Sequence, residues 1–203
     1  MGGRIALHGL TDWWMTAFSE AERQHIKLVH GAGGLGGDLL GLDSGDHRGI
    51  QTTQSPGQFL WSLAGWFLGP DNRLIARKII EKAEKVCLSS PDILDLHCTY
   101  GTMIKVYYPD RTMDPAALQR AIYACERQIA IAGQAARVFK REYNGQPLPA
   151  HAGFTQLAII REKEKNYAEA IRLSNEAQQQ GWAGDWDKRI ARYEQKLAKQ
   201  QQK

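Results

Sequence analysis

The sequence predicts an all-α protein, and three observations carry that prediction. A capping residue directly precedes a proline at Ser55-Pro56, Ser90-Pro91 and Asp114-Pro115, which is the arrangement of a helix start. Apolar residues recur at intervals of three and four in several segments, as on one face of a helix. In addition, no segment alternates β-branched and polar residues with the period of a strand.

The composition sets the class of protein. The chain has 203 residues, of which 43% are hydrophobic and 24% charged, enough to bury one sizeable core. The mean hydropathy is -0.45, and the most apolar stretch, 60–68, is too short to cross a membrane. The sequence shows no signal-peptide pattern, and its three cysteines form no close pair, so we expect a cytoplasmic protein without disulfides. The net charge of +4 permits an acidic partner without requiring one.

The N-terminal region, 1–54, is predicted to hold one helix and a loop. The helix is expected to start at Thr11, to turn Trp14, Phe18 and Ile26 toward a core, and to end near Gly31. The glycine-rich stretch 31–54 then predicts a flexible loop.

The remainder, 55–203, is predicted to be one helical domain. Periodic apolar residues predict helices over 73–87 and behind Asp114, and a further helix is expected near 135–143. Asp185 is predicted to cap a last helix whose apolar stripe is Trp186, Ile190, Tyr193 and Leu197.

Alanines repeat at fixed spacings within this domain. Ala76 and Ala83 follow Ala64 by twelve and nineteen residues, and Ala170 and Ala177 follow Ala158 by the same intervals. Leu60 and Phe154 stand four residues before the first alanine of each set. With Leu157, Tyr167 and a weaker unit at Tyr100, Gly101 and Ile104, this pattern resembles the tetratricopeptide repeat over about residues 56–200. The resemblance implies antiparallel helix pairs stacked as a short right-handed superhelix.

The same resemblance implies a function. Such proteins bind a peptide or a partner protein on the inner face, which is formed by the first helix of each pair. We therefore expect an interaction module without a cofactor or enzymatic activity, and self-association is a further use of the same face. The residues at the corresponding inner positions are Trp61, Leu68, Thr102, Lys105, Thr155, Ile159 and Glu162.

Two other classes of function compete with this interpretation. The first is nucleic-acid binding by basic residues, which nearby acidic residues and the mild net charge disfavour. The basic residues concerned are Arg137, Lys140, Arg141, Lys188, Arg189, Arg192, Lys196 and Lys199. The segment 31–36 contains the literal spacing of a dinucleotide-binding loop. That loop must follow a strand, however, whereas the preceding residues 19–30 have the pattern of a helix.

Catalytic and metal sites are not indicated by the sequence. His97 and Cys98 are adjacent, and neighbouring residues on a helix point about 100° apart, so they cannot form a nucleophile–base pair. We expect Cys98 to be packed and His97 to lie at the surface. The six histidines show no spacing typical of metal ligands.

Overall fold

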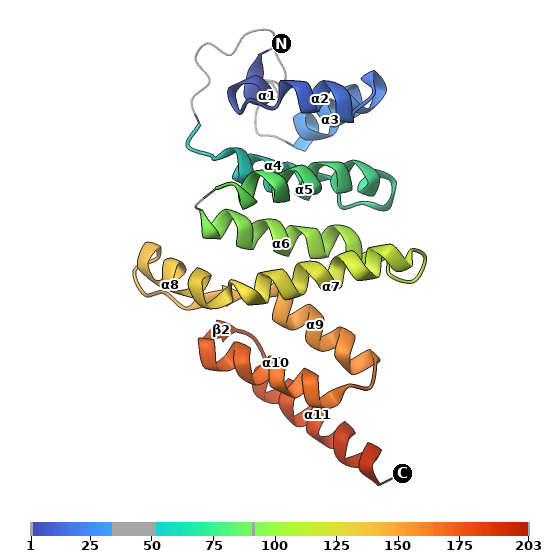
Figure 1. Ribbon diagram of the computed structural model, residues 1–203, viewed down its shortest axis with the longest axis vertical. Coiled ribbons are helices and arrows are strands. Elements are labelled where there is room, and N and C mark those ends of the chain that lie inside the picture. The colour runs from blue at the N-terminus through green and yellow to red at the C-terminus, as the bar shows by residue number, and fades with distance from the viewer. Residues whose placement is uncertain (1, 34–51, 91, 203) are drawn as a thin grey trace. The chain divides into compact units, whose positions relative to one another are not determined.

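The computed structural model describes residues 2–33, 52–90 and 92–202, and these are helical apart from turns and two short strands (Figure 1). The prediction of an all-α protein is therefore confirmed. No helix in these three ranges is both long and apolar enough to cross a membrane. The protein divides into two compact units, with the boundary between Val86 and Cys87. The predicted division between residues 54 and 55 stays a prediction.

Unit 1 contains the first helices. They are α1 (Gly3–Leu7), α2 (Thr11–Ala17), α3 (Glu20–Gly33), α4 (Pro56–Ala64), the short 3-10 helices η2 (Gly65–Phe67) and η3 (Pro70–Asn72), and α5 (Arg73–Leu88), whose last residues belong to unit 2. The predicted start at Ser55-Pro56 is confirmed, because the Ser55 hydroxyl accepts a hydrogen bond from the backbone N–H of Gln58 at 2.9 Å.

The single helix predicted from Thr11 onward is wrong, since the backbone breaks it at Phe18. Phe18 has an extended backbone, and Ser19 and Glu22 then cap each other's backbone N–H groups as a capping box. The Arg23 guanidinium donates to the Phe18 carbonyl and fixes the corner. The apolar period continues across this break, which is why the stripe alone did not reveal it.

Helix α3 contacts both α5 and η3 within unit 1. Glu22 and Lys78 form an ion pair at 2.6 Å, and His25 contacts Asn72 at 2.7 Å. Trp14 and Ile26, two of the residues predicted to face a core, are fully buried.

Unit 2 contains the remaining elements. They are α6 (Ile93–Tyr107), η4 (Tyr108–Asp110), α7 (Pro115–Ala130), α8 (Ala132–Glu142), α9 (Ala152–Lys163), α10 (Tyr167–Gln180) and α11 (Trp186–Gln201), with the strands β1 (Leu148–Ala150) and β2 (Trp182–Ala183) paired in parallel. In Figure 1, α9 and α10 run in opposite directions on either side of a short turn.

The helix caps of unit 2 confirm the predicted start of α7, move the start of α6, and place Asp185 at the N-cap of α11 as predicted but without a capping bond from its side chain. Asp114 accepts from the Ala116 N–H and begins α7 as predicted. Helix α6 is capped by Asp92, which accepts from two backbone N–H groups, so it begins after the predicted start at Ser90-Pro91. Asp185 occupies the N-cap of α11, but its carboxylate accepts from Arg189 instead of a backbone N–H.

The repeated alanines belong to the buried core of the two units. All six are fully buried, namely Ala64, Ala76, Ala83, Ala158, Ala170 and Ala177. In unit 2, α6 packs against α7, α9 against α10, and α10 against α11. Small buried side chains let helix backbones come close, so the alanine spacing marked positions that are buried, while the repeat itself stays a prediction.

Candidate functional site

The predicted partner-binding residues are divided between the two units. Trp61 on α4 and Leu68 after η2 are half-buried in unit 1. The other five belong to unit 2, with Thr102 and Lys105 on α6, and Thr155, Ile159 and Glu162 on α9. Lys105 is exposed and the other four are half-buried. Because α6 packs against α9, the structure brings these five residues onto two neighbouring helices.

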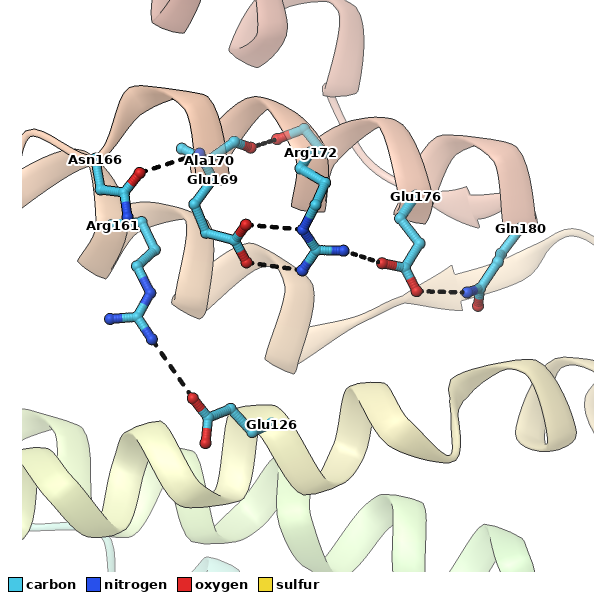
Figure 2. A network of polar contacts seen from close by, with 9 residues as sticks. Glu126, Arg161, Asn166, Glu169, Ala170, Arg172, Glu176 and Gln180 are labelled. Atoms are coloured by element: carbon cyan, nitrogen blue, oxygen red, sulfur yellow. Dashed lines mark hydrogen bonds and ion pairs between the residues drawn. The ribbon is translucent and has the colours of Figure 1, made fainter.

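Helix α9 is fixed by charged contacts on two sides. Its Arg161 reaches Glu126 on α7 at 3.4 Å (Figure 2). Its Glu162 accepts from Arg192 at 3.0 Å and from Lys196 at 2.8 Å, both on α11. The Glu162 side chain is only 16% exposed, so this predicted partner contact also holds two cations of α11 in place.

The charged side chains of α10 pair with one another. Figure 2 shows Arg172 between Glu169 and Glu176, with two hydrogen bonds of 2.7 Å to Glu169 and one of 2.9 Å to Glu176. The Glu176 carboxylate also accepts from Gln180 at 3.3 Å. Hydrogen bonding to Arg172 lowers the pKa of Glu169, and the same contact raises the pKa of Arg172. Two carboxylates of this helix therefore share one guanidinium.

The basic residues considered for nucleic-acid binding lie on two different helices. Arg137, Lys140 and Arg141 lie on α8, and the others lie on α11. On α11, Arg189 pairs with Asp185, and Arg192 and Lys196 pair with Glu162. Much of this positive charge is therefore compensated within the protein.

A buried aromatic and histidine cluster lies at the junction of several unit 2 elements. The prediction that His97 lies at the surface is wrong, because it is only 5% exposed. Its ring stacks on Trp182 of β2 at 5.4 Å between centroids, and it meets Phe139 of α8 and His151 edge-on at 5.6 and 5.0 Å. Rings from well-separated parts of the sequence thus enclose this imidazole.

Hydrogen bonds join the cluster to the backbone. The Gln128 amide donates to the His97 carbonyl at 2.9 Å and accepts from the Gly153 N–H at 2.6 Å. His151 is fully buried and caps α9, since its Nδ1 accepts from the Phe154 N–H at 3.2 Å. A Cβ atom at Gly153 would lie 2.9 Å from the Gln128 oxygen, so glycine is needed for this close approach.

Burial keeps both histidines neutral. It lowers the pKa of His97 to about 4, and burial together with the neighbouring His97 lowers the pKa of His151 to about 3. The atoms His97 Nδ1 and His151 Nε2 have no hydrogen-bond partner among the described residues. Burial also raises the pKa of Cys98 to about 11, which keeps the thiol protonated and unsuited to nucleophilic attack.

An open apolar recess of about 280 Å³ lies beside the cluster. It is lined by Phe139, Tyr143, Gln146, Pro147 and Pro149. The Phe139 ring takes part in both features, since it also packs edge-on against Trp182 at 6.0 Å.

The glycine-rich segment is described only in part. Residues 34–51 of the predicted loop lie outside the described residues, whereas Gly31 and Gly33 belong to the end of α3. The expectation that a helix precedes these glycines is confirmed. In the described parts of the protein, no group of three or more His, Cys, Asp or Glu side chains is arranged to hold a metal ion.

Sequence reasoning missed the residues that organise unit 2 internally. Gln128 and His151 were not predicted to be buried, because a glutamine on a helix and a single histidine are usually exposed or half-exposed. The one available signal was position, since His151 directly precedes the small residues that open α9.

Compared with known proteins, this sequence matches no family model, and no curated protein and no solved structure matches it.

Proposed function

We propose that this protein is a non-enzymatic interaction module that binds a peptide or a partner protein on the first helices of tetratricopeptide-like pairs. The proposal includes a short right-handed superhelix, the arrangement that the resemblance to the tetratricopeptide repeat implies. The three free cysteines suit a reducing compartment, which supports action in the cytoplasm.

The observation that carries the proposal is the surface of α9. Thr155 and Ile159 are half-buried and leave part of their side chains accessible on a helix whose backbone is fixed by contacts to α7, α10 and α11. A partner that covers such side chains gains apolar burial without ordering the helix first, which favours binding. Lys105 on the adjacent α6 adds an exposed cation to the same pair of helices.

Affinity capture with matched variants tests the proposal. Ile159→Glu places a charge on the proposed surface, and Ala168→Glu places the same charge on an exposed position of α10. Proteins captured by the unchanged protein and by Ala168→Glu should be depleted about tenfold with Ile159→Glu, as quantified by mass spectrometry. Circular dichroism and the urea midpoint confirm that both variants are folded.

One result of the capture experiment would refute the proposed binding face. If Ile159→Glu and a second variant, Thr155→Arg, capture the same proteins in the same amounts as the unchanged protein, the α9 surface is not the binding face. A nucleotide-dependent enzyme would instead be stabilised against heat by ATP, NAD or FAD.

A further inference from the structure

A second recess in unit 2 is lined by positive charge. It has a volume of about 270 Å³ and lies between the α9–α10 turn and the end of α11. Its lining residues are Lys165, Tyr167, Lys196, Lys199 and Gln200, so three cations and no carboxylate border it.

Only one of the three lysines forms an ion pair in the described structure. Lys196 donates to Glu162 at 2.8 Å, whereas Lys165 and Lys199 pair with no carboxylate among the described residues. The charges on α10 are by contrast paired along the helix, as Arg172 shows. The recess is therefore a place where positive charge is concentrated and left uncompensated, and such a place attracts an anion.

The backbone of Lys165 provides an independent observation. Lys165 has a φ of 61°, in the left-handed region where glycine is the usual residue after a helix end. The turn is closed by bonds from the Lys165 N–H to the Glu162 carbonyl and from the Asn166 N–H to the Arg161 carbonyl. Glycine would satisfy this turn without strain, so the Lys165 side chain can be removed by a glycine substitution that leaves the turn intact.

The positive charge of the recess and the polypeptide nature of the proposed partner together point to carboxylates, which are the anionic groups of a polypeptide. The lysines offer compact ammonium groups that pair with a carboxylate as point charges, and no arginine lines the recess. Nucleic acid requires an extended positive track with aromatic stacking. The three lysines of the recess lie at one place and do not form such a track.

We propose that this recess binds carboxylates of an acidic polypeptide segment, with Lys165 and Lys199 as the principal contacts. The inference rests on the proposed function, since it names the chemistry of the partner. The carboxylates come either from Asp and Glu side chains or from the free C-terminus of a polypeptide.

Peptide titrations test the proposal with the whole protein. The probes are a fluorescent tetraglutamate peptide blocked at both ends and an alanine peptide with a free C-terminus. At low ionic strength the protein should bind one of them, and added salt should weaken the binding. Binding of the first probe assigns the site to acidic side chains, and binding of the second assigns it to a C-terminus.

Two variants separate binding from folding. Lys165→Gly combined with Lys199→Gln removes both unpaired cations and relieves the left-handed backbone, so the urea midpoint should not fall while binding weakens about tenfold. Lys188→Gln removes one charge at the exposed far end of α11 and should weaken binding less than about twofold.

Several results would overturn the proposal. The first is that neither peptide binds, and the second is that Lys188→Gln weakens peptide binding as much as the double variant does. The others are displacement of the peptide by an equal concentration of inorganic phosphate, and binding of a short oligothymidine that depends on the same lysines and is tighter than peptide binding. Because Ile159→Glu tests the α9 surface separately, failure of these titrations with a positive capture experiment rejects only the acidic-segment proposal.

Discussion

Acidification from pH 7.5 to pH 5 should destabilise unit 2 through His97 and His151. The pKa of each is lowered in the folded protein, to about 4 and about 3, from an ordinary value of 6.5. The unfolded state therefore binds more protons than the folded state throughout this window, and stability falls as the pH falls.

The structure explains why the folded protein resists protonation. A proton added to His151 at Nδ1 would displace the Phe154 N–H, which that atom accepts to cap α9. The added charge would also lie 5.0 Å from the His97 ring, measured between centroids, in a site without a carboxylate partner in the described structure. Each histidine should contribute about 2 kcal/mol of lost stability between pH 7.5 and pH 5, or about 4 kcal/mol together. That is a large fraction of the roughly 5–15 kcal/mol typical of a folded protein.

Urea unfolding at a series of pH values measures this loss. The comparison variant is His97→Phe with His151→Asn, which keeps a ring against Trp182 and a capping side chain on α9 but removes both titrating groups. Its stability should vary by less than about 1 kcal/mol over the same window. His8 in unit 1, whose pKa is also lowered by burial, is present in both proteins and cancels in the comparison.

Imidazole NMR provides the direct readout. Neither His97 nor His151 should titrate above pH 5, whereas an ordinary histidine titrates near 6.5. A titration midpoint near 6.5 for both rings, or an equal pH dependence in the variant, would refute the reasoning.

Three further substitutions test the packing of unit 2, each by the urea midpoint of the whole protein. Gly153→Ala should lower the free energy of unfolding by about 1–3 kcal/mol, because the new Cβ would lie 2.9 Å from a backbone carbonyl of α7. A Cβ at Gly133 would have no neighbour within 4 Å, so Gly133→Ala should be neutral or stabilising. Equal effects of the two substitutions would contradict this reasoning. Ala158→Leu should cost about 1–3 kcal/mol by separating α9 from its neighbours, while Ala168→Leu on an exposed position should change stability by less than about 0.5 kcal/mol. Gln128→Leu should cost about 1–3 kcal/mol because the buried Gly153 N–H loses its acceptor, and an unchanged midpoint would show that this bond is dispensable.

Local chemistry made several elements of the fold predictable from sequence. Ser55 and Asp114 begin helices as predicted, because a side-chain oxygen next to a proline acts within one turn and needs no distant partner. The break at Phe18 was missed for the opposite reason. It depends on Arg23 reaching back to a carbonyl, while the apolar period runs through the corner unchanged.

The surroundings of polar residues were much less predictable. His97 was expected at the surface, but its burial depends on Gln128, His151 and Trp182, which come from other elements. Helical periodicity reports which face of a helix is apolar and contains no information on a polar residue whose partners are distant in sequence. Glu162 shows the same limit, since its position on α9 was identified but its ion pairs to α11 were not.

The net charge of +4 illustrates why pairing matters more than composition for recognition. On α10 and at the start of α11, each arginine meets a carboxylate at hydrogen-bond distance, so its positive field is largely compensated. Lys165 and Lys199 border a recess without a carboxylate in its lining. An acidic partner would therefore be attracted to this end of unit 2 even though the whole protein is only mildly basic, and attraction should decline with salt.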